Sequence, residues 1–130
     1  KMRGSEANDA FRIDENGNIT MVQGDTGRLV VNGLNTDQNY TIYFAIQDEK
    51  RKPVGNEINV ESNLQPSVVF VLDSSLTDLL KVKTDEETAT YYYGVKTCTA
   101  DGFEDTLPIG GSDMGDKNTI TVYPKKVEGC

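Results

Sequence analysis

Residues 86–98 read EETATYYYGVKTC, a run of β-forming residues that contains three consecutive tyrosines. Successive side chains of a strand point to opposite faces, so the run predicts a long strand over residues 88–98 with two distinct faces. We expect Tyr91, Tyr93 and Val95 to face a core. Tyr92 and Lys96 should face outward, because a lysine is rarely enclosed in a dry interior. This segment therefore predicts a core strand of a β domain.

Other strand signals recur along the chain, separated by turn residues. The Asn16-Gly17 dipeptide tolerates positive φ and predicts a hairpin. Residues 40–47 alternate, with Tyr40, Ile42, Phe44 and Ile46 on one face, whereas residues 67–73 are apolar on both faces, as in a central sandwich strand. The predicted strands cover residues 11–14, 18–23, 27–32, 40–47, 57–60, 67–73, 88–98, 104–109 and 119–124. Short strands at this regular spacing predict an all-β, immunoglobulin-like antiparallel β-sandwich.

One short helix is predicted over about residues 74–81. Ser74 or Ser75 can accept the first free backbone N–H groups, and Asp78 stands three residues after Ser75, as in a capping box. The apolar stripe of this helix would be made by Leu76, Leu79 and Leu80.

The size and charge of the chain restrict its function. Its 130 residues suit one domain, which we expect to span residues 11–127, between a flexible segment over 1–10 and a tail over 128–130. The net charge is −8, which opposes binding to nucleic acid or to an anionic membrane surface. The sequence also lacks an apolar run of the roughly 20 residues that span a bilayer. We therefore predict neither a nucleic-acid partner nor a membrane partner.

Enzymatic chemistry is limited by the absence of histidine. Without an imidazole there is no Ser-His-Asp or Cys-His nucleophile and no histidine-containing zinc site. The two cysteines, Cys98 and Cys130, are too few for a disulfide framework and are expected to be free thiols, with a Cys98–Cys130 bond as the alternative. We predict no catalytic residue, no metal and no cofactor, and hence a protein that is not an enzyme.

The tyrosine run resembles a known motif. EETATYYYG is similar to the stretch of immunoglobulin variable domains in which an acid-Thr-Ala segment leads through two tyrosines to the core cysteine of strand F. The resemblance implies that Tyr91 forms a tyrosine corner and that Tyr93 takes the place of the cysteine. No cysteine stands at that place and the chain has no tryptophan. The resemblance therefore implies a sandwich corner and no antibody function.

A second resemblance extends over most of the chain. It rests on GNITMVQGDTGRLVV at 17–31, on TYYYGVKTCTADGFEDTL at 90–107 after the predicted helix, and on NTITVYPKKVEG at 118–129. In this order the segments resemble a small protein of prophage tail modules of Gram-positive bacteria, similar in layout to the N-terminal β-sandwich domain of the phage baseplate upper protein. The resemblance implies a virion structural protein that is assembled in the bacterial cytoplasm. Its partners would be other tail or baseplate proteins, or further copies of itself.

The alternative is an immunoglobulin-like module, secreted or at the cell surface, that binds a glycan or a host protein. A sugar-binding module should gather aromatic rings around one concavity, whereas an assembly protein should present a flatter patch or an unpaired strand edge. Tyr92, Lys96 and Tyr123 are predicted on the outward faces of two strands. Because tyrosine is enriched at interfaces, we predict that these three residues form an interaction face.

Overall fold

The chain folds into strands and one helical turn in a computed structural model, which describes residues 11–107 and 118–125. The elements are β1 (Arg12–Ile13), β2 (Ile19–Val22), β3 (Gly27–Val31), β4 (Tyr40–Gln47), β5 (Ile58–Glu61), β6 (Val68–Leu72), α1 (Ser74–Thr77), β7 (Ala89–Thr99), β8 (Glu104–Leu107) and β9 (Asn118–Tyr123). The predicted fold class, all-β with one short helix, is confirmed.

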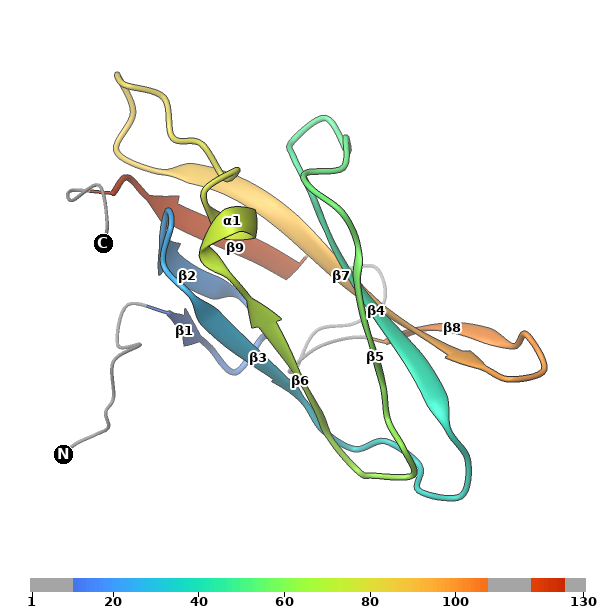
Figure 1. The fold of residues 1–130 in the computed structure, drawn as a ribbon. Helices are drawn as coiled ribbons and strands as arrows, with labels where there is room; N and C mark the ends of the chain where they lie inside the picture. Colours follow the sequence, from blue (N-terminus) through green and yellow to red (C-terminus); the bar gives the residue numbers. More distant parts are fainter. Residues whose placement is uncertain (1–10, 108–117, 126–130) are drawn as a thin grey trace, which may run out of the picture.

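Two sheets face each other across the core (Figure 1). The larger has the order β1-β2-β9-β7-β4-β5, and β8 pairs with β7 beyond the end of the β9 pairing; the smaller consists of β3 and β6. This arrangement is an immunoglobulin-like sandwich. Its strands pair antiparallel as predicted, except that β2 runs parallel to β9.

The core lies between the inner faces of the two sheets. Phe44 on β4 is 1% exposed, and its ring centroid lies 5.6 Å from that of Phe70 on β6 and 5.4 Å from that of Tyr93 on β7. Ile42 and Ile46 are buried on the same side of β4, which confirms the alternation predicted for residues 40–47. Phe44 therefore joins both sheets through one aromatic cluster.

The register predicted for the tyrosine run is also confirmed. Tyr93 and Val95 are buried and Tyr91 is partly buried, while Lys96 is exposed. The Tyr91 hydroxyl donates a hydrogen bond to the backbone carbonyl of Lys81 at 2.7 Å. This bond spans the bend before β7 and is the tyrosine corner that the resemblance implied.

Tyr93 occupies the core position predicted for it. Its hydroxyl donates to the carbonyl of Gly17, in the turn that joins β1 to β2. Burial raises the pKa of Tyr93, with a smaller contribution from the negative charge of Asp14. The turn itself confirms the predicted hairpin: Gly17 has φ 84, and the Asp14 carboxylate accepts the backbone N–H of Asn18 at 2.9 Å.

The predicted helix cap was wrong. Helix α1 covers only Ser74–Thr77, and its N-cap is Asp73, whose carboxylate accepts the Leu76 backbone N–H at 3.0 Å. Ser75 instead donates its hydroxyl to that carboxylate, because an ionised carboxylate is the stronger acceptor. Asp78 forms no capping box and pairs with Lys125 at 2.7 Å. Since the helix ends early, Leu80 is buried but Leu79 is 46% exposed.

The prediction of a central strand at 67–73 was also wrong. Strand β6 pairs only with β3 among the described strands, so the small sheet has an inner face and an outer face without a covering layer. Val68, Phe70 and Leu72 face the core, while Val69 and Val71 are 45% and 50% exposed. An apolar run therefore marks a strand here, but its second face meets solvent.

Several predictions concern residues outside the described ranges. These are the flexible segment over 1–10, the last part of the strand predicted at 104–109, the tail over 128–130 and the state of Cys130.

Candidate functional site

The outer face of the large sheet carries a hollow of about 630 Å³, which we call the tyrosine hollow. Its floor is a cross-strand pair of small residues, Ala45 on β4 and Gly94 on β7. Tyr92 precedes Gly94 on the same face, and Tyr43 lies two residues before Ala45. The hollow exists because the small pair leaves a gap between two large aromatic side chains.

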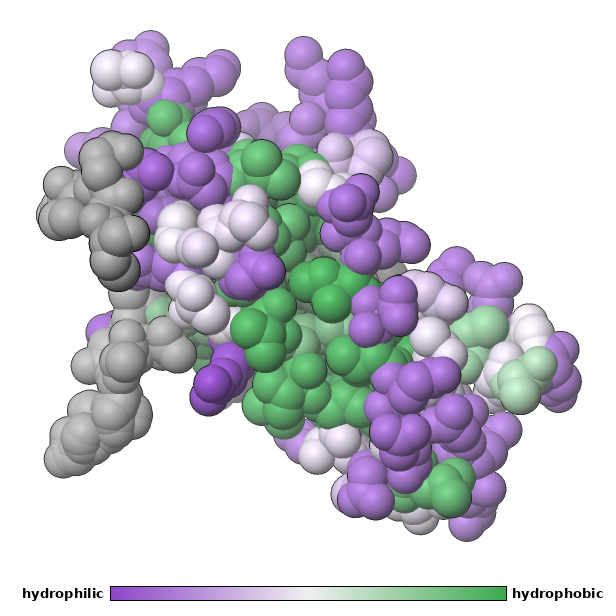
Figure 2. All heavy atoms as spheres, in the orientation of Figure 1, coloured by the Kyte–Doolittle hydropathy of each residue, from purple (hydrophilic) through white to green (hydrophobic). Residues whose placement is uncertain are grey.

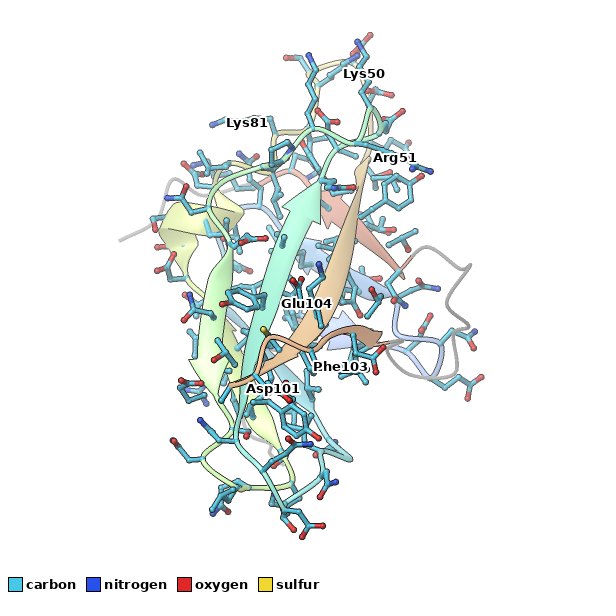
Figure 3. The ribbon with its side chains drawn as sticks, turned by 90° about the vertical axis from the view of Figure 1, so that its right-hand side faces the viewer. Lys50, Arg51, Lys81, Asp101, Phe103 and Glu104 are labelled. Carbon is cyan, nitrogen blue, oxygen red and sulfur yellow. The ribbon has the colours of Figure 1, made fainter. Side chains whose placement is uncertain are left out.

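The loop after β4 supplies one end of the hollow. The Asp48 carboxylate accepts the backbone N–H groups of Lys50 and Lys52 at 2.8 and 3.0 Å, which holds the loop in a tight turn. Arg51 has φ 65 within this turn. Both Glu49 and Arg51 line the hollow as a result. Figure 3 faces this side of the molecule and shows Arg51 beyond the end of β4.

The hairpin of β7 and β8 supplies the opposite end. Lys96 of β7 pairs with Glu104 of β8 at 3.0 Å, and both side chains are about half exposed. The hydrogen bond that Lys96 donates to the Glu104 carboxylate, helped by the negative charge of Glu104, raises the pKa of Lys96. Glu104 is visible on this hairpin in Figure 3, near the exposed Phe103. With Glu57, the lining contains three carboxylates and two cations.

The three residues predicted as an interaction face are only partly brought together. Tyr92 and Lys96 both line the tyrosine hollow. Tyr123 points outward from β9 and is 47% exposed, but it does not line the hollow. It lies four residues beyond Thr119, the β9 partner of Tyr92. Tyr43, Ala45 and the loop residues were missed as site residues, because sequence alone does not reveal the strand pairing that sets Tyr43 opposite Lys96 and Ala45 opposite Gly94.

Cys98 is a free thiol on the same face of β7 and also lines the hollow. Its side chain is of intermediate exposure, and its free state agrees with the free thiol predicted for Cys98.

A second surface lies on the opposite sheet. Val30, Val69 and Val71, which we call the valine face, are 50%, 45% and 50% exposed on the outer side of β3 and β6. Val30 and Val69 are direct cross-strand partners, and Arg28 lies opposite Val71. Figure 2 shows hydrophobic side chains gathered over β3, β6 and the neighbouring β5.

A smaller hollow of about 300 Å³ adjoins the valine face. It lies between α1 and the start of β5, and Val71, Ile58, Leu76 and Leu79 line it. Val71 belongs both to the valine face and to this hollow, whose lining also includes the polar residues Asn56, Glu57, Asp73 and Ser75. The apolar pattern of residues 67–73 could have indicated the exposed valines if the strand had been placed in an outer layer.

Within residues 11–107 and 118–125, no group of three or more cysteine, aspartate and glutamate side chains is placed to hold a metal ion. In the same residues, no helix is long and apolar enough to cross a membrane.

Comparisons with known proteins give a structural likeness and no sequence match. No protein-family description and no curated protein matches the sequence. The fold is similar to the crystal structure of the periplasmic chaperone SfaE, with a TM-score of 0.47 and 11% sequence identity. The similarity covers 82% of this chain and 52% of that chain, so this chain spans about half the length of the chaperone structure.

Proposed function

We propose that this protein is a non-enzymatic assembly component of a phage tail or baseplate, and that it docks to another virion protein through the valine face. The observation that carries the docking proposal is the set of three half-exposed valines on a two-stranded sheet. Neighbouring apolar side chains that are exposed together on a protein surface commonly mark a site of protein–protein interaction. The phage-tail setting, and assembly in the bacterial cytoplasm, are supported by the sequence resemblance.

The form of this surface suits a protein partner. The outer side of the β3–β6 sheet is open, and the adjoining hollow of about 300 Å³ can take an apolar side chain from the partner. Among the described strands, β5 and β6 each have one edge without a hydrogen-bonded neighbour, to which a partner strand could add.

Charge favours a different protein over a second copy of this chain. Two copies would each bring a net charge of −8, and this repulsion opposes self-association. Arg28 lies opposite Val71, beside the valine face. Its positive charge would repel a basic residue at that point of the partner surface. The partner surface is therefore apolar, and neutral or acidic where it meets Arg28.

The test replaces Val30, Val69 and Val71 together with threonine, which keeps the branched shape and the strand preference but removes the apolar surface. Ile13→Thr is the matched control, because Ile13 is 44% exposed on β1 of the other sheet. The parent and each variant are expressed in the host that carries the phage. Phage tails are then purified, and the presence of the chain in them is measured.

The parent chain and Ile13→Thr should be found in the tails, while the triple variant should be missing although its melting temperature is unchanged. If the parent is absent from purified tails, the tail assignment fails. If the triple variant is incorporated as well as the parent, the docking surface has been misplaced.

A further inference from the structure

We propose that the tyrosine hollow is a binding site for a neutral oligosaccharide. This inference does not depend on the docking proposal, because the hollow and the valine face lie on the outer sides of different sheets.

The shape of the hollow is that of a ligand site. Its volume of about 630 Å³ falls within the range of roughly 300–1,000 Å³ that is usual for small-molecule pockets. Tyr43 lies two residues before Ala45 on β4, and Tyr92 is paired with Gln47, two residues after Ala45. The cross-strand rows that hold the two tyrosines are therefore four residues apart, on opposite sides of the Ala45–Gly94 pair. Since a strand rises about 3.3 Å per residue, the two rows are separated by roughly 13 Å along the strands. This separation exceeds one sugar ring and suits a chain of several sugars.

The lining combines the two kinds of group that a saccharide needs. The rings of Tyr43 and Tyr92 are partly buried and offer apolar surface to the C–H faces of sugar rings. The carboxylates of Glu49 and Glu57 can accept hydrogen bonds from sugar hydroxyls, and Arg51 can donate to them. A neutral polyol fits this mixed set of donors and acceptors.

The charges favour a neutral ligand over an anionic one. Three carboxylates and two cations line the hollow, and the Lys96–Glu104 ion pair occupies one of each. The remaining groups carry more negative than positive charge, and the whole chain carries −8. An anionic polysaccharide or a nucleotide would therefore be repelled.

The backbone of the floor disfavours an added peptide strand. Strand β4 pairs with β5 on one side and β7 on the other, and β7 pairs with β4 and with β8 or β9. The β5 pairing covers Thr41–Phe44, and the β9 and β8 pairings of β7 end on either side of Gly94. Among the described strands, only short stretches at the floor therefore lack a second partner, and recognition depends on side chains.

Gly94 provides a variant that closes the site without harming the fold. A Cβ atom added there would meet no atom within 4 Å, and its backbone is outside the left-handed region. Gly94→Val should therefore fold, because valine prefers strands more than glycine does, and its side chain would fill the floor.

The experiment is an NMR titration of the full chain with maltohexaose, cellohexaose and chitohexaose, and with oligogalacturonate as the anionic comparison. At least one neutral hexaose should shift the backbone amide signals of Ala45, Gly94 and Lys96. Tyr43→Ala and Tyr92→Ala should each weaken binding by about tenfold, the effect of losing one aromatic contact. Tyr123→Ala is the matched control and should bind as the parent does, since Tyr123 lies outside the hollow.

Two further outcomes complete the test. Gly94→Val should abolish the shifts at a melting temperature no lower than that of the parent. In a Cys130→Ser background, the bound hexaose should slow alkylation of Cys98, which lines the hollow. A ligand concentration of about 10 mM would reveal binding with a dissociation constant of about 1 mM. If none of the three neutral hexaoses shifts these amide signals at that concentration, the proposal is overturned. It is overturned equally if oligogalacturonate binds as tightly as they do, or if Gly94→Val binds like the parent.

Discussion

Replacement of Phe44 by alanine should remove the contact that joins the two sheets. Phe44 is 1% exposed and packs against rings on β6 and β7. Truncation of a buried phenylalanine costs about 3–5 kcal/mol, from lost transfer free energy and from the cavity left behind. This is a large part of the roughly 5–15 kcal/mol that stabilises a typical domain. For a chain of this length each kcal/mol lowers the melting temperature by about 3–4 °C, so we expect a fall of about 10–20 °C.

The assay is thermal and urea denaturation followed by circular dichroism, with Phe103→Ala as the matched control. Phe103 is 68% exposed, so its truncation should leave the melting temperature nearly unchanged. Phe44→Leu keeps most of the volume and should fall between the two, which preserves the test if Phe44→Ala does not fold. A melting temperature of Phe44→Ala equal to that of Phe103→Ala would show that Phe44 does not join the sheets.

Three other predictions follow from the hydrogen bonds of the fold. Tyr91→Phe removes the hydroxyl that donates a hydrogen bond to the Lys81 carbonyl. It should lower the free energy of unfolding, measured by urea denaturation, by about 0.5–1.5 kcal/mol. An unchanged free energy of unfolding would contradict a structural role for the corner. The hydrogen bond from Ser75, together with the N-terminal amides of α1, lowers the pKa of Asp73. The ionised Asp73 carboxylate therefore stabilises the folded state above the ordinary aspartate pKa, and this stabilisation is lost as the pH falls below it. The free energy of unfolding should fall less steeply with decreasing pH in Asp73→Asn than in the parent. An identical dependence on acid pH would exclude this role for Asp73. Burial raises the pKa of Tyr93, so stability should be lost as the pH rises above the ordinary tyrosine pKa of about 10, and Tyr93→Phe should show a smaller alkaline loss than the parent; an equal loss would contradict the burial.

The residues of β4 and β7 explain why most strands could be predicted. Every second side chain is buried over residues 42–46 of β4 and 93–97 of β7, and period 2 is a local property that sequence displays directly. The helix cap was harder to predict, because Asp73 and two serines can each accept a backbone N–H group. Only the backbone geometry selected Asp73.

The candidate site was only partly predictable for a related reason. Parity placed Tyr92 and Lys96 on an outward face of β7, and the structure agrees. The alternation of side chains within one strand says nothing about which strands are neighbours. Tyr43 and Ala45 were therefore missed, although they lie beside β7 in the sheet. Tyr123 shares the outward direction but lies too far along β9 to line the same hollow.

The amino-acid sequence by itself determined most of the strands and the face of β7 on which each of its tyrosines lies, since these depend on residue type and on the period of a single segment. The role of Tyr91 at a sandwich corner was implied by the resemblance of the tyrosine run. The tertiary structure decided which faces remain open. It placed the apolar strand β6 in a two-stranded outer sheet, which exposes Val69 and Val71, and it set Ala45 opposite Gly94 to create the hollow. Both outcomes depend on pairing between segments distant in the chain, where register is fixed by the burial of all inner faces together rather than by any one segment.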